Sequence, residues 1–359
     1  MSRLIREYPL FISILALGIF SYWEHAISAT VLGNMVGFVI LFGVIVYTSM
    51  SVAHHAELLA EKFGEPYGTL ILTMSAVIVE IVIISIMMIH ENNPTLARDT
   101  IYAAIMLDVN GLLGFAAIVG GLKYGEQAYN VDSSNAYLSM LLVAVGVAMV
   151  IPDFINPIYY DRFMLFNIVI FVLLYGVFTR VQLKNHKYFF EYKSDNSQAT
   201  TSHSHSETKN ISTIYHASLL VVYIVMIGVL SEILALFMSN DIEYLGLPMA
   251  ISAVGVAIIS ASPELITAVR AALDNRMQTV INIALGASLA TVLLTIPAVI
   301  IIGMITGLKI ELGLTPIQSV MIGLTLLVSM INFSDGETNV LEGFLHVILF
   351  VLFGFLIFI

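Results

Sequence analysis

Long apolar stretches separated by short polar breaks run along the whole chain. A membrane-spanning helix needs about 20 mostly apolar residues. Stretches near that length lie at residues 8–23, 30–56, 68–89, 100–122, 136–151, 163–181, 215–238, 247–269, 278–306, 315–333 and 342–359. The pattern therefore predicts an all-α polytopic membrane protein with about eleven transmembrane helices.

The first stretch has two interpretations. Arg3 and Arg6 precede a short apolar core, as in a secretory signal peptide. However, Trp23, Glu24 and His25 stand where a cleavage site prefers small neutral residues. A retained N-terminal helix, residues 1–29, is the interpretation that these residues favour.

Composition agrees with a membrane protein and excludes several activities. The chain is 59% hydrophobic and only 11% charged, with a mean hydropathy of +0.95, whereas soluble domains are about 45–50% apolar and about 25% charged. It has no cysteine, no Gly-rich phosphate loop and no HExxH sequence, so the residues for thiol chemistry, ATP drive and zinc proteolysis are lacking. The net charge of −11 and the apolar spans exclude nucleic-acid binding. We expect neither an enzyme nor a cofactor.

The basic residues predict the orientation in the membrane. With the N-terminus inside, 11 of the 14 lysines and arginines fall on the inner side, and only Arg98, Arg162 and Lys309 fall outside. Cytoplasmic loops carry such an excess of basic residues. The sequence therefore predicts a cytoplasmic N-terminus and an outer C-terminus.

A polar segment divides the chain. Residues 182–214 are rich in Ser, Thr, Asn and Lys, which is typical of a cytoplasmic linker. His203 and His205 within it could bind a metal ion weakly, but a linker without further spaced ligands is the preferred interpretation.

The two halves on either side of the linker resemble each other. "AELLA" (residues 56–60) recurs as "SEILA" (residues 231–235), and each is followed by a glycine, a proline and a long apolar helix with one glutamate. Five spans in each half, residues 30–181 and 215–359, make equivalent helices cross the membrane in opposite directions. Inverted repeats of this kind are frequent in secondary transporters, whose substrate site lies near the midplane where the repeats meet.

The two glutamates in these helices are the main site candidates. Glu80 lies about 12 residues, or about 18 Å, into its predicted helix, and Glu264 lies at a similar depth in the other repeat. A carboxylate at that depth costs several kcal/mol unless it is paired, protonated or hydrated. Each could be a structural hydrogen-bonded carboxyl, but two at symmetric positions favour a shared function.

Further oxygen atoms lie beside Glu264. Pro263 removes one backbone N–H, which interrupts the helical hydrogen bonds and releases a carbonyl oxygen, and Ser260 and Ser262 add hydroxyls. Such oxygens suit calcium or sodium. The alternative is a simple kink at the proline and helix packing by the serines.

Three other acids are candidates for gating or proton relay. Glu57 and Glu232 occupy equivalent positions in the two repeats near helix ends, where an ordinary solvated carboxylate is nearly as good an explanation. Asp108 lies deep in the fourth span and has no obvious counterpart in the second half.

The order and spacing of several motifs resemble those of the cation/proton exchangers, the calcium:proton antiporter family of the calcium/cation antiporter superfamily. The similar segments are residues 64–85 and 175–186, "SEILA", residues 260–288 and "DGETNVLEG" at residues 335–343. The resemblance implies that Glu80 and Glu264 bind the cation and exchange protons, as the metal ligands. It also implies that Glu57 and Glu232 flank the path, and that Ser288, a polar residue of the helix after the second motif, belongs to the cation- and proton-binding site.

One departure affects ion preference. The family usually places a Gly-Asn pair shortly before each acidic residue, whereas this chain has Ala76 and Val77 before Glu80. Calcium prefers about 6–8 oxygen ligands, so the first half of the site is poorer in ligands. The pattern is most similar to the bacterial branch of the family, which is associated with sodium and potassium as well as calcium.

We therefore predict a cation:proton antiporter of the bacterial inner membrane that exports calcium, sodium or potassium. A monovalent-cation/proton antiporter with little calcium activity is one alternative, and a cation channel or an intramembrane enzyme is another. Its expected partners are membrane lipid and the transported cations and protons; whether it forms a homo-oligomer stays open.

Overall fold

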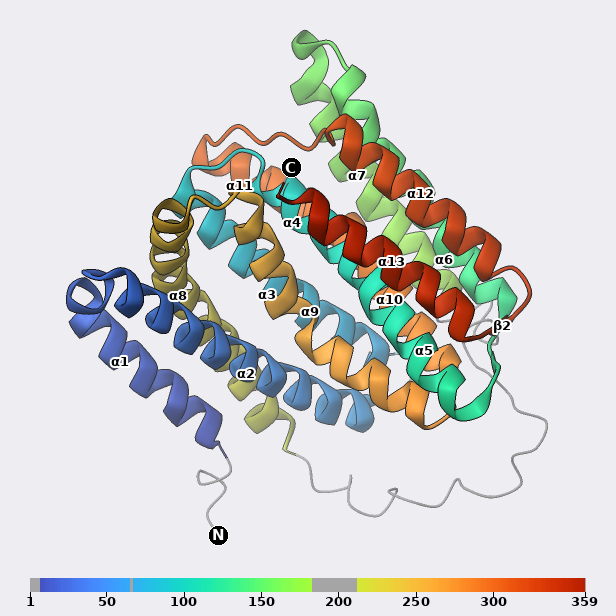
Figure 1. Cartoon of the computed structure of the whole chain (residues 1–359), viewed down its shortest axis with the longest axis horizontal. Helices are drawn as coiled ribbons and strands as arrows, with labels where there is room; N and C mark the ends of the chain where they lie inside the picture. The colour runs from blue at the N-terminus through green and yellow to red at the C-terminus, as the bar shows by residue number, and fades with distance from the viewer. Residues whose placement is uncertain (1–6, 65–66, 183–211, 359) are drawn as a thin grey trace. The chain divides into compact units, whose positions relative to one another are not determined.

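The chain is almost entirely helical in the computed structural model, which describes residues 7–64, 67–182 and 212–358 (Figure 1). The predicted linker, with His203 and His205, lies mostly outside the described residues. In chain order the elements are α1 (Tyr8–Ser28), α2 (Val31–Phe63), α3 (Tyr67–Glu91), α4 (Leu96–Ile105), η2 (Met106–Leu112), α5 (Leu113–Tyr124), β1 (Gln127–Ala128), α6 (Val131–Val145), η3 (Gly146–Val150), η4 (Ile151–Phe154), η5 (Pro157–Tyr159), α7 (Tyr160–Arg180), α8 (Thr213–Leu245), α9 (Ala250–Leu273), α10 (Met277–Ala290), η9 (Thr291–Thr295), α11 (Ile296–Thr306), α12 (Pro316–Asn332), β2 (Glu337–Thr338) and α13 (Val340–Leu356).

The predicted membrane-spanning architecture is confirmed. Within the described part of the chain, 9 helical stretches are long and apolar enough to cross a membrane, and two shorter apolar helices, α12 and α13, follow them. These eleven segments coincide with the eleven predicted spans. Several begin or end a few residues further out, most clearly α2, which runs on to Phe63.

The long helices end where glycine permits a positive φ. Gly64 caps α2 with φ 64° and ψ 177°, and Gly246 caps α8 with φ 62° and ψ 35°. Glycine adopts such angles readily because it has no Cβ. These are the two glycines that the repeat comparison paired, so equivalent helices end in equivalent ways.

The helices form two compact units. Unit 1 comprises residues 1–96 and 199–263, and unit 2 comprises residues 97–198 and 264–359. Each unit therefore combines elements from both predicted repeats. The boundary between the units falls inside α9, between Pro263 and Glu264.

Unit 1 is built around α2 and α8, which have 33 residues each and pack along each other. Helix α3 packs against both of them, and α1 covers a side of the pair (Figure 1). A buried amide joins the two long helices: Asn34 Nδ2 donates to Phe237 O and to Asp241 Oδ1, each at 2.7 Å. Apolar packing accompanies it, since the Phe20 and Phe237 rings meet edge to face with centroids 5.5 Å apart.

Unit 2 contains the remaining helices. Helix α5 packs against α13 through glycines: a Cβ on Gly114 would lie 2.9 Å from Gly343 O, so only glycine allows this approach. Strands β1 and β2 pair antiparallel, with Gln127 opposite Thr338, a short ladder that the sequence did not predict. Lys123 Nζ and Tyr124 Oη both donate to Leu273 O at 2.7 Å, which satisfies the C-terminal end of α9.

Candidate functional site

Glu80 lies near the middle of α3, within unit 1. Glu80 is 4% exposed. Four aliphatic residues near it in the sequence are at least as deeply buried: Val77, Val79, Ile83 and Ile84. Its helix packs closely on α8, where a Cβ on Gly228 would lie 3.1 Å from Val82. The structure thus places Glu80 in a buried, closely packed part of unit 1, with aliphatic residues as its sequence neighbours.

Glu264 has a more open and more polar position. It is partly exposed and follows Pro263, which stands inside α9. The hydroxyl of Ser260 donates to Ala257 O at 3.1 Å, and the hydroxyl of Ser262 donates to Ile258 O. Both serine oxygens keep lone pairs for a cation. Oxygen atoms therefore gather on the turn of α9 that precedes Glu264, and none is contributed by the residues just before Glu80.

Pro263 does not break α9, which continues as one helix from Ala250 to Leu273. The expected interruption is confined to one missing hydrogen bond, because proline lacks the N–H that would reach Ile259 O. Ser49 of α2 only partly replaces it: its Oγ lies 3.4 Å from Ile259 O, which is the longer branch of a hydrogen bond shared with Val46 O at 2.9 Å. Sequence reasoning missed Ser49, since no local pattern connects it with a residue 210 positions away.

Asp108 and Ser288 lie together in unit 2. Ser288 Oγ donates to Asp108 Oδ2 at 3.1 Å. Ser288 is 0% exposed and Asp108 is 3% exposed. Asp108 lies on η2, a π-helical segment, and Ser288 on α10 shortly before a second π-helical segment, η9. Asp108, which has no obvious counterpart in the second half, thus contacts Ser288, which lies in the equivalent span of that half. Such π-helical segments occur frequently at functional sites.

The two flanking acids differ in exposure. Glu57 of α2 is half-buried, whereas Glu232 of α8 is exposed. Both lie in unit 1, on the two helices that pack along each other.

No group of three or more histidine or carboxylate side chains that could hold a metal ion occurs in the described ranges.

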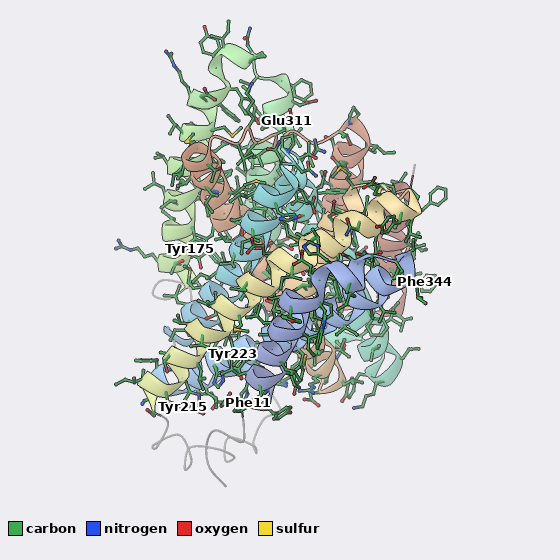
Figure 2. The ribbon with its side chains drawn as sticks, turned by 90° about the vertical axis from the view of Figure 1, so that its left-hand side faces the viewer. Phe11, Tyr175, Tyr215, Tyr223, Glu311 and Phe344 are labelled. Atoms are coloured by element: carbon green, nitrogen blue, oxygen red, sulfur yellow. The ribbon has the colours of Figure 1, made fainter. Side chains whose placement is uncertain are left out.

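A second polar cluster, absent from the sequence predictions, lies in unit 1. Glu7 accepts hydrogen bonds from Tyr215 Oη at 2.9 Å and Tyr223 Oη at 2.8 Å, and its Oε2 lies 3.2 Å from His55 Nε2. His55 Nδ1 lies 2.9 Å from His216 Nδ1. Tyr215 and Tyr223 are labelled in Figure 2, at the N-terminal end of α8. This cluster joins α1, α2 and α8.

Comparison with known proteins identifies the family. A model of the sodium/calcium exchanger protein family matches residues 33–184 and 215–359, which is most of the chain. The chain belongs to this family. The residues left unmatched between the two segments, 185–214, overlap the predicted linker at residues 182–214.

Relatives and solved structures agree with this assignment. The chain is 31% identical over 355 residues to the sodium-potassium/proton antiporter ChaA of Escherichia coli (strain K12), covering 98% of this chain and 96% of the relative. It is 24% identical over 274 residues to a Ca²⁺/H⁺ antiporter of Aphanothece halophytica, covering 72% and 73%. The structure of native YfkE superposes with a TM-score of 0.76 at 19% identity, covering 98% of this chain and 99% of that one. The resemblance that the motifs indicated is confirmed, and the family is one of ion exchangers rather than enzymes.

Proposed function

We propose that this exchanger is a cation:proton antiporter in which Glu80 and Glu264 carry the exchanged protons and bind the cation. The observation that carries the proposal is the equivalent placement of the two acids. Each lies within the apolar helix that follows a 33-residue, glycine-capped helix. Antiporters of sodium, potassium and calcium among the relatives support the general activity.

Charge accounting explains the coupling. With both carboxyls protonated the pair is neutral, and with both ionised it can hold one divalent cation and remain neutral. The empty, doubly ionised form is disfavoured because uncompensated charge in an apolar environment is costly. Exchange of about two protons for one calcium follows from this penalty. For a monovalent cation, one carboxyl stays protonated.

The remaining candidates take supporting roles in this proposal. Ser260 and Ser262 supply neutral oxygens next to Glu264, while Asp108, held by Ser288, relays protons. Glu57 and Glu232 lie along the entry path. The chain lies in the bacterial inner membrane with its N-terminus in the cytoplasm and its C-terminus outside. Inward proton movement then drives the cation out of the cell.

Ion preference follows from the unequal half-sites. The chain supplies serine oxygens before Glu264 but only Ala76, Val77, Ile78 and Val79 before Glu80. Because calcium needs more oxygen ligands than this arrangement readily supplies, we favour sodium or potassium as cargo alongside calcium. A channel would line a continuous pore with polar side chains, and the candidates here are concentrated at a few points instead.

The test replaces each carboxyl by its uncharged isostere. We expect Glu80→Gln and Glu264→Gln each to abolish cation-dependent proton flux in everted membrane vesicles, measured with calcium, sodium and potassium at alkaline pH. Glutamine resembles the protonated acid in shape, so membrane insertion should be unaffected. Glu311→Gln, at an exposed loop carboxylate, is the matched control and should transport normally. Near-normal flux in either core variant would show that the two-carboxylate mechanism is wrong.

A further inference from the structure

A second buried polar group lies on the same π-helical segment as Asp108, centred on Asn110. The Asn110 Nδ2 group donates to Thr325 Oγ1 of α12 at 2.8 Å and to the sulfur of Met106 at 3.4 Å. The Thr325 hydroxyl in turn donates to the same sulfur at 3.7 Å. Asn110 and Thr325 are both 0% exposed. An amide buried this completely contributes to stability only when its hydrogen bonds are made.

His346 of α13 completes the group. Its Nδ1 lies 3.0 Å from Asn110 Oδ1. Since the Asn110 amide nitrogen already donates to Thr325, the oxygen must be the acceptor, and His346 Nδ1 carries the proton. The imidazole is fully buried and stacks on Phe333, with centroids 5.4 Å apart and planes at 11°. The contacts with Asn110 and Phe333 together fix the orientation of the imidazole ring.

These contacts hold the π-helical segment from helices other than the one that carries Ser288. Met106 and Asn110, four residues apart, are tied to α12 and α13, while Asp108 between them is tied to α10 through Ser288. A π-helical turn contains one more residue than an α-helical turn, and relaxing it shifts the register by one residue. That shift rotates a side chain by about 100° about the helix axis. Asp108 would then lose its place beside Ser288.

We propose that Asn110, Thr325 and His346 are positioning residues that keep η2 π-helical and so hold the Asp108 carboxylate against Ser288. This inference rests on the relay role proposed for Asp108 and adds the device that maintains it. The three residues take no part in binding the cation themselves. Their effect on transport passes through the position of Asp108.

The first experiment removes one hydroxyl without changing side-chain shape. We expect Thr325→Val to raise the half-saturating cation concentration about threefold to tenfold, the effect of one lost buried hydrogen bond. The pH profile of exchange should change as well, because the contacts that position Asp108, the proposed proton relay, are weakened. Thr325→Ser restores the hydroxyl and should restore both. Thr100→Val, at an equally buried threonine of α4, is the control and should change neither.

Two further variants decide whether the effect passes through Asp108. His346→Phe keeps the stacking on Phe333 but removes the donor to Asn110, and we expect it to reproduce the Thr325→Val profile. In a Ser288→Ala background the hydrogen bond between Ser288 and Asp108 is already lost. Thr325→Val should then change the half-saturating cation concentration by less than about twofold.

The outcomes separate this inference from the proposed function. Unchanged pH profiles in Thr325→Val and His346→Phe, or a full additional effect in the Ser288→Ala background, would overturn the positioning role while leaving exchange through Glu80 and Glu264 intact. If Asp108→Asn kept the wild-type pH profile, the relay role would be wrong and the positioning role would fall with it. Loss of the two-glutamate mechanism would appear only in the Glu80 and Glu264 variants.

Discussion

A proline inside a buried helix leaves one carbonyl oxygen without its usual N–H partner. In α9 this oxygen belongs to Ile259, which is 0% exposed, and the Ser49 Oγ of α2 lies 3.4 Å from it while donating to Val46 O at 2.9 Å. An unmade hydrogen bond at such a depth would cost about 1–3 kcal/mol. The long contact from Ser49 offsets only part of this cost, directly beside the candidate residue Glu264.

The carboxylate of Glu7 is surrounded by the hydrogen-bond donors Tyr215 and Tyr223 and by His55. Burial alone would raise the pKa of Glu7, but hydrogen bonds from Tyr223 and Tyr215 and the neighbouring His55 outweigh it, and the pKa lies below its ordinary value. The ionised form is the one that these donors stabilise. The contribution of Glu7 to stability is therefore present above its ordinary pKa of 4.5 and is lost as the pH falls through the lowered value.

We expect Glu7→Gln to lower the thermal unfolding midpoint of the purified protein in detergent at pH 7, because two tyrosine hydroxyls lose a charged acceptor. At a pH below the lowered pKa of Glu7 the wild-type carboxyl is itself protonated, so the difference between the two proteins should shrink. Glu61→Gln, at an exposed position of α2, serves as the control. A difference in midpoint that stayed constant between the two pH values would contradict the stabilising role of the ionised Glu7.

At the scale of whole elements, the two repeats share details that their sequences show only faintly. Helices α2 and α8 have the same length and both end at a glycine with positive φ. The fourth and ninth spans each contain a π-helical segment, η2 and η9. Matching interruptions in equivalent helices are expected when both repeats serve one transport path.

The two glycine caps should respond differently to alanine. A Cβ would meet no atom within 4 Å at either position, so any cost comes from the backbone alone. At Gly246, in the left-handed helical region, we expect Gly→Ala to cost about 1–2 kcal/mol of unfolding free energy. At Gly64, with ψ 177°, only glycine is comfortable, and the cost should be larger, up to about 3 kcal/mol.

Denaturant unfolding in mixed micelles measures both costs. Gly176→Ala, inside α7 with nothing within 4 Å of the added Cβ, is the matched control and should be neutral or stabilising by up to about 1 kcal/mol. Equal losses of unfolding free energy in Gly64→Ala and Gly246→Ala would contradict the different backbone angles of these two glycines.

For the molecule as a whole, charge and repeat symmetry predict the same topology. An odd number of spans in each repeat inverts one relative to the other, and the excess of lysine and arginine on one side sets the orientation. The loop that carries Glu311 is then outside and the loop that carries Asp274 is inside. Both side chains are exposed and accessible to labelling.

The absence of cysteine from the chain makes this orientation directly measurable. We expect Glu311→Cys to react with a membrane-impermeant maleimide on intact cells, and Asp274→Cys to react only after permeabilisation. The parent chain, with no thiol, gives the background. The opposite labelling pattern would reverse the predicted orientation and, with it, the direction of cation export.

The sequence by itself determined the spans, because about 20 consecutive apolar residues can satisfy their backbone in a bilayer only as a helix. It also determined the family, through the order of its motifs, and the candidate acids, because charged residues are rare and costly in such segments. The repeat was visible for the same reason: glycines, prolines and acids stand out against an apolar background.

Only the tertiary structure decided which polar residues meet. The contacts of Asp108 with Ser288, of Asn110 with Thr325 and His346, and of Ser49 with Ile259 O join residues 180 to 236 positions apart. The π-helical register of η2 was equally hidden, since its polar residues Asp108 and Asn110 stand out in the sequence but do not indicate how the helix is wound. Helix packing brings distant side chains together, and buried polar groups then require partners, so these contacts depend on the folded arrangement of the helices rather than on any local pattern.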